Sequence, residues 1–200
     1  MADETSRDEL RAGHPRNQLS GPRLGSLIGA VFGLVYLEAN AGSLPAPAAL
    51  ALRLAGAAAF AGLVSLLIIT RGADRPGTEH PGAGGFGRGY WLIVAAEGAA
   101  IVGGSALLTG LLDLPGRGVV AWVSVVVGVH FVALGAIWRT RLFHVLGAAI
   151  ATSGIAGLIA ASEAASGTIV ATFGAVVPGA LLLAFAYWGV LNSPRPVSDA

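Results

Sequence analysis

Two of the ionisable residues that lie within long apolar segments, Glu97 and His130, are placed to meet at one depth. Glu97 precedes Pro115 by 18 residues, and His130 follows it by 15. If both segments are helices joined by a turn at Pro115, the two side chains differ in depth by about 4–5 Å. A carboxyl group and an imidazole so placed can exchange protons, as relay residues of pumps do, or contact a polar substrate. The alternative is a hydrogen bond that only holds two helices together.

A second couple, Glu38 and Arg53, flanks an earlier turn centred near Leu44. Glu38 precedes Leu44 by six residues and Arg53 follows it by nine, so their depths also agree to about 4–5 Å. The spacing predicts an ion pair between neighbouring helices near one membrane face. Such a pair could serve as a gate or attract anions, but pairing also lowers the cost of charge in lipid. We favour the structural role.

The composition around these residues is that of a membrane protein. Of 200 residues, 54% are hydrophobic and 12% are charged, about half the charge of an average soluble domain. So few charges cannot cover the surface of a soluble protein, and so many apolar residues exclude a wholly disordered chain. The sequence therefore predicts an integral membrane protein.

Six apolar segments have the length of membrane spans. Each is close to the roughly 20 residues needed to cross a ~30 Å hydrocarbon core, where the backbone must satisfy its own hydrogen bonds as helix. The predicted fold is therefore all-α, with six transmembrane helices in a compact bundle. The spans are placed at 23–41, 47–70, 90–112, 118–138, 142–162 and 167–191, between a disordered tail at 1–22 and a polar tail at 192–200.

The distribution of arginine predicts the orientation. The chain has no lysine, and if the N-terminus is cytoplasmic, ten arginines fall in cytoplasmic segments while Arg117 alone falls in an outer loop. This bias places both termini in the cytoplasm. We expect a multi-pass protein of the bacterial cytoplasmic membrane.

Small residues and one proline shape the predicted helices. Gly25, Gly29 and Gly33 recur at intervals of four along the first span, which lets another backbone approach closely. The ridge serves either internal packing, which we favour, or a homo-oligomer. Pro178 removes a backbone donor within the sixth span and predicts a kink. Discontinuous helices can form transporter binding sites, although many proline kinks have no such role.

Several kinds of chemistry are not expected. The chain has no cysteine and no lysine, which excludes thiolate chemistry and lysine Schiff bases. The four histidines do not have the spacing of a helical metal site, so we expect no metal and no cofactor. A net charge of +1 gives no bulk attraction to nucleic acid. The expected partners are the lipid bilayer and a small solute or ion.

Residues 33–45, which include Asn40, together with residues 127–131 around His130, resemble uncharacterised six-helix membrane proteins of actinobacteria. The similarity extends over most of the membrane region. It implies an inner-membrane location and draws attention to Asn40 and His130, but it carries no activity.

Three functions remain open from the sequence. The first is a small proton- or ion-coupled transporter or channel that uses Glu97 and His130. The second is a non-catalytic membrane scaffold or accessory subunit, in which the polar couples set helix register. The third, an intramembrane enzyme, has least support, because the sequence offers no Ser/His/Asp constellation, paired aspartates or metal motif.

Overall fold

The computed structural model describes residues 21–70, 88–111 and 116–192 and contains only helices and short turns in these ranges. Six helices are long and apolar enough to cross a membrane, which confirms the all-helical prediction for the described residues. In chain order the elements are α2 (Gly21–Asn40), the 3₁₀ turn η1 (Ala41–Ser43), α3 (Ala46–Ile69), α4 (Arg88–Gly110), α5 (Gly116–Trp138), α6 (Arg141–Ser162), α7 (Gly167–Ala171), the π-helix η3 (Thr172–Val176) and α8 (Val177–Leu191).

The predicted spans agree with the helices to within two residues at each end. Two details differ. Helix α2 begins at Gly21, inside the region predicted as tail, because Pro22 fits the first helical turn, where the backbone N–H has no intrahelical partner. The sixth span is α-helix, π-helix and α-helix in succession. Residues 1–20 and 193–200 of the predicted tails lie outside the described residues.

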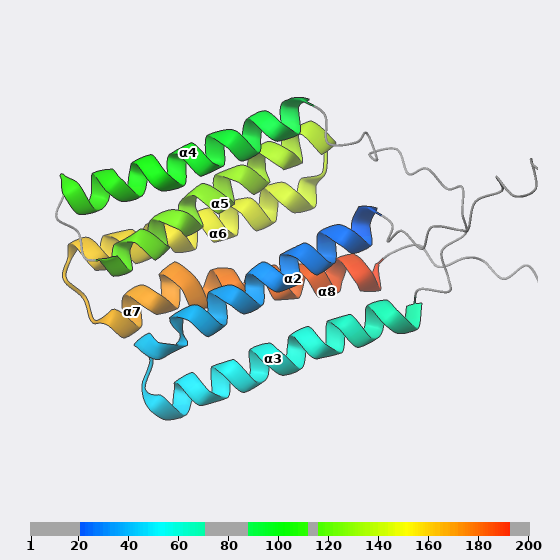
Figure 1. The fold of residues 1–200 in the computed structure, drawn as a ribbon, viewed down its shortest axis with the longest axis horizontal. Coiled ribbons are helices and arrows are strands. Elements are labelled where there is room, and N and C mark those ends of the chain that lie inside the picture. Colours follow the sequence, from blue (N-terminus) through cyan, green and yellow to red (C-terminus); the bar gives the residue numbers. More distant parts are fainter. Residues whose placement is uncertain (1–20, 71–87, 112–115, 193–200) are drawn as a thin grey trace, which may run out of the picture.

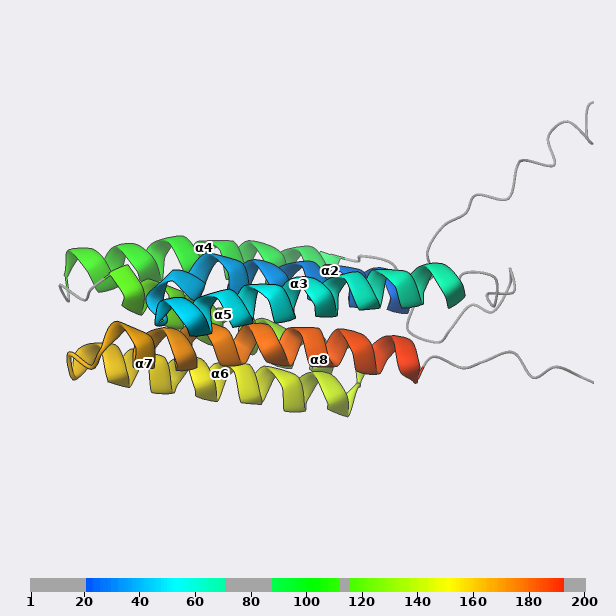
Figure 2. The ribbon, with the colours of Figure 1, turned by 90° about the horizontal axis from the view of Figure 1, so that it is seen from below.

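The long helices lie side by side and alternate in direction (Figure 1), with α4 at one edge and α3 at the other. Seen at right angles, α2, α3 and α4 lie on one side, and α6, α7 and α8 lie on the other (Figure 2). The described chain begins and ends at the same end of the helices (Figure 1).

Glycine allows α5 and α6 to approach at backbone distance. A Cβ added to Gly147 would lie 2.5 Å from the carbonyl oxygen of Gly128, and one added to Gly154 would lie 2.7 Å from the backbone nitrogen of Val125. A side chain at either position would therefore clash with the other helix. Such close approach of two backbones is typical of small-residue interfaces between membrane helices, where dispersion contacts replace the hydrophobic effect.

The last span lies at the centre of the packing. Leu63 of α3 and Ala186 of α8 are fully buried in one apolar cluster, while Ile150 of α6 packs with Leu182 of α8 in another. Helix α4 is the opposite case. Of its most apolar stretch of 18 residues 6% is buried, whereas 50% is buried in the corresponding stretch of the last span. The polar side chains on α4 therefore have few helices to meet.

Candidate polar site in the membrane

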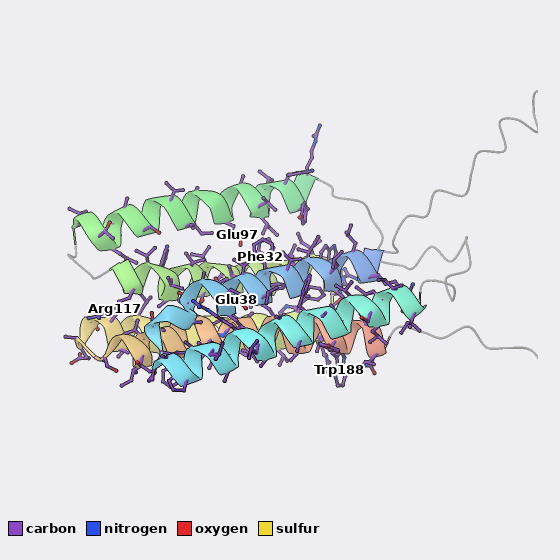
Figure 3. All side chains as sticks on the ribbon, turned by 60° about the horizontal axis from the view of Figure 1, so that its bottom comes forward. Phe32, Glu38, Glu97, Arg117 and Trp188 are labelled. Atoms are coloured by element: carbon purple, nitrogen blue, oxygen red, sulfur yellow. The ribbon has the colours of Figure 1, made fainter. Side chains whose placement is uncertain are left out.

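Glu97 lies on the one face of α4 that turns toward the rest of the chain. The partly or fully buried residues of this helix follow a spacing of three or four, and they are Tyr90, Ile93, Val94, Glu97, Ala100, Ile101, Gly104, Ser105 and Leu108. This face is anchored to α5, where the Trp122 indole packs against Gly104 and its N–H donates to the carbonyl of Ala100 at 2.9 Å. The labelled Glu97 side chain points to the same side of α4 (Figure 3).

The structure brings Glu97 and His130 together. Oε2 of Glu97 lies 3.0 Å from Nδ1 of His130, and the two side chains keep 21% and 13% of their exposure. The Nδ1 atom is itself buried, and its contact with the carboxylate lacks the alignment of a hydrogen bond. The ring also meets Phe131 edge to face at 5.8 Å. A carboxyl group and an imidazole are thus in direct contact between two apolar helices.

A tyrosine of α2 joins this couple. Tyr36 keeps 9% of its exposure, and its hydroxyl is buried without a partner in hydrogen-bond geometry. Ser124 of α5 and Glu97 of α4 both lie within electrostatic reach of this hydroxyl. Glu97, His130, Tyr36 and Ser124 therefore form one polar group drawn from three helices, which we call the polar cluster.

Ser124 connects the polar cluster to the π-helix. Its hydroxyl is fully buried and donates to the carbonyl of Gly174 at 2.6 Å, while Ser153 of α6 donates to the carbonyl of Phe173 at 2.6 Å. In an α-helix the backbone N–H of residue 178 would donate to the carbonyl of Gly174, and in a π-helix it would donate to the carbonyl of Phe173. Residue 178 is proline, which has no backbone N–H to donate. The predicted kink is therefore a π-helix that ends just before Pro178, and serine hydroxyls replace the missing donor.

The second predicted couple also forms a contact. Nε of Arg53 lies 3.7 Å from Oε2 of Glu38, and the side chains keep 50% and 39% of their exposure. The pair joins α2 to α3 close to η1. Nearby, Asn40 donates from Nδ2 to the carbonyl of Tyr36 at 2.9 Å, which satisfies the amide within its own helix. Such exposure is consistent with a structural pair at the membrane edge.

The glycine ridge of the first span lies mostly inside the chain. A Cβ on Gly33 would lie 2.8 Å from the carbonyl oxygen of Gly179, and one on Gly29 would lie 3.9 Å from that of Leu182, so both face the last span. Gly25 has open space around it. The first and last spans thus use the ridge for their own contact.

The described residues hold no group of three or more His, Asp or Glu side chains that could bind a metal ion. A shallow groove of about 460 Å³ lies between α6 and the last span, lined by Thr152, Ser153 and Phe173 among others. It is almost wholly apolar, and it does not include Glu97 or His130.

Six apolar helices with a polar cluster inside define a helical, multi-pass membrane protein. Comparison of the chain with protein-family models, with curated proteins and with solved structures finds no match.

Sequence reasoning missed Tyr36, Ser124 and Ser153. Ser124 is the only hydroxyl-bearing residue in α5, and Tyr36 lies within an otherwise apolar stretch of α2. An isolated hydroxyl in an apolar helix indicates a buried polar contact, because a hydroxyl in lipid needs a hydrogen-bond partner. It does not show which helix supplies the partner, since that depends on which spans are neighbours.

Proposed function

We propose that the protein is a small proton- or ion-coupled transporter or channel of the bacterial cytoplasmic membrane, with Glu97 and His130 as the ion-binding couple on its path. The observation that carries this proposal is the 3.0 Å contact between an acid and an imidazole inside two apolar helices. A charged residue at the centre of a membrane helix costs about 2.5–3.5 kcal/mol, so such residues are rarely kept without a use.

The arginines support an orientation with both ends of the chain in the cytoplasm. Arg23, Arg88, Arg139 and Arg141 lie at or next to helix ends on one side, and Arg117 lies at the start of α5 on the other. Arg117 is labelled at this opposite end in Figure 3. Arginine is enriched on the cytoplasmic side of membrane proteins, so the side with four arginines is assigned to the cytoplasm.

The position of the couple fits a path through the membrane. His130 is eight residues from the Trp138 end of α5, and Glu97 is nine from the Arg88 end of α4. Both therefore lie about 12–14 Å from the proposed cytoplasmic ends, too deep for the headgroups to reach. An ion that moved between the two sides would have to pass this depth.

Purified protein in proteoliposomes tests the proposal. We expect E97Q and H130A each to abolish the pH-dependent ion flux of the parent protein, with little change in folding. E97Q is the sharper variant, because glutamine has nearly the shape of glutamate and can still contact His130, but it cannot titrate. E163Q is the matched control, since Glu163 is exposed in the turn after α6. A parent protein that moves no ion, or an E97Q variant that moves ions at the parent rate, contradicts the proposal.

A scaffold or accessory subunit is the second candidate, and the exposure of α4 favours it. Leu108 is the only buried residue of this helix, and Trp91, Leu92 and Val102 are exposed on its other faces. A partner helix could cover this surface in the membrane. This candidate predicts that E97Q lowers expression or recovery of a partner, and that the parent protein conducts no ion.

A further inference from the structure

The face of α4 that meets α5 is mostly apolar, and apolar contacts alone do not fix where one membrane helix lies against another. Lipid is as apolar as this face, so a helix that slides or turns exchanges apolar protein contacts for equally apolar lipid. A shift of one residue along the helical path moves a side chain by about 1.5 Å and turns it by about 100°. Such a shift would take Glu97 away from His130, which it now meets at 3.0 Å. The position of Glu97 therefore depends on a contact that has a direction.

The polar side chains in the middle and second half of α4 do not provide this contact. Nδ1 of His130 has no partner in hydrogen-bond geometry, so the carboxylate of Glu97 is close to the imidazole but not aligned with it. The hydroxyl of Ser105 is buried without a hydrogen-bond partner, and that of Thr109 donates within its own helix to the carbonyl of Ser105. Glu97, Ser105 and Thr109 therefore do not tie α4 to α5 by a hydrogen bond.

The indole of Trp122 on α5 does provide a directed contact. Its N–H donates to the carbonyl of Ala100 at 2.9 Å, and Ala100 follows Glu97 by three residues on the same face of α4. The indole lies against Gly104, where an added Cβ would overlap the ring. The hydrogen bond sets the depth of α4 against α5, and the packing on Gly104 sets its rotation.

We propose that Trp122 is a positioning residue, which holds α4 at the depth and rotation where Glu97 meets His130. The inference goes beyond the proposed function, because it assigns what makes the contact and not what passes it. Trp122 acts through the backbone of α4, about 4–5 Å along the axis from Glu97. Loss of the indole N–H should therefore disturb the contact although both of its side chains are still present.

The ring-nitrogen NMR signals of His130, recorded at one pH from histidine-labelled protein in lipid nanodiscs, report the contact directly. H130A identifies the signals, and E97Q shows where they lie when the carboxylate is absent. We expect W122F, which keeps an aromatic ring but has no N–H, to move the signals most of the way toward their position in E97Q. G104L, which places a side chain where the indole packs, should move them at least as far.

Two matched controls separate this effect from a general change in α4. G103L alters the residue next to Gly104, but Gly103 has open space around it. W91F removes an indole whose residue is 61% exposed on α4. Both variants should leave the His130 signals at their parent position.

Ion flux in proteoliposomes adds a second measurement, and this one rests on the proposed function. A misplacement of about 1 Å can lower the rate at a reacting group a hundredfold, so we expect W122F to lower the initial rate of pH-dependent flux at least about tenfold. G103L and W91F should conduct at the parent rate.

The outcomes separate the positioning role from the transport function. If the His130 signals stay at their parent position in W122F, Trp122 does not position Glu97, whether or not G104L folds. If G103L and W91F move the signals as far as W122F does, the shift reports a general loosening of α4 and the inference is wrong. If the signals move as expected but the parent protein carries no ion, the proposed function fails and the positioning role of Trp122 stands.

Discussion

The π-helix offers a quantitative prediction, because two serines act where a proline has removed a donor. Ser124→Ala would leave the Gly174 carbonyl, now held by a 2.6 Å hydrogen bond, without this donor in a buried site. An unsatisfied buried carbonyl costs about 1–3 kcal/mol, and hydrogen bonds between membrane helices average nearer 0.6 kcal/mol. We expect Ser124→Ala to lower the free energy of unfolding by about 1–2 kcal/mol.

The fall in the free energy of unfolding caused by Ser124→Ala should be smaller in a protein that also carries Pro178→Ala. Pro178→Ala supplies the N–H that an α-helix would direct at the Gly174 carbonyl, so the carbonyl no longer depends on Ser124. A double-mutant cycle should therefore give a coupling energy of about 1 kcal/mol between Ser124 and Pro178.

The assay is equilibrium unfolding in mixed detergent micelles, followed by circular dichroism, for the parent, the two single variants and the double variant. S65A serves as the control, because Ser65 is exposed and bonds only within its own helix. It should change stability by less than about 0.5 kcal/mol. If Ser124→Ala lowers the free energy of unfolding equally in the parent and in the Pro178→Ala variant, Ser124 is not the replacement donor.

Three further predictions follow from helix contacts. Gly147→Leu should separate α5 from α6 and lower the melting temperature sharply, whereas Gly110→Leu, in open space, should leave it nearly unchanged. Replacing Glu38 and Arg53 by glutamine, singly and together, should give a coupling of less than about 1 kcal/mol in detergent unfolding, because both side chains are exposed. Trp122→Phe removes a hydrogen bond to α4, and faster proteolysis between α4 and α5 should reveal the loosened helix.

The sequence predicted the two couples because their depths depend only on the rise of a helix. Counting residues from Leu44 and Pro115 placed Glu38 beside Arg53 and Glu97 beside His130, and in each case the structure has the side chains in contact. Neighbouring spans joined by a short turn must lie side by side, so little else was required.

Contacts between spans distant in sequence could not be found in this way. Gly33 packs on Gly179 and Ser153 bonds to Phe173, although nothing in the spacing of these residues pairs their helices. Lipid is as apolar as the protein interior, so hydrophobic periodicity does not show which face of a membrane helix is buried. Tyr36 was missed for this reason, since its burial depends on which face α2 turns toward the other helices.

The π-helix was predicted only as a kink. Pro178 shows that a donor is missing, but helix bending, water or a hydroxyl from another span can each compensate. The choice depended on Ser124 and Ser153 lying opposite the freed carbonyls.

The central claim is that Glu97 and His130 work as a titrating couple and do not only hold α4 to α5. The most direct measurement is the initial rate of proton entry into liposomes that contain E97Q, taken with its melting temperature. We predict that the rate falls to the level of protein-free liposomes while the melting temperature stays close to that of the parent. Proton entry at the parent rate would contradict the claim.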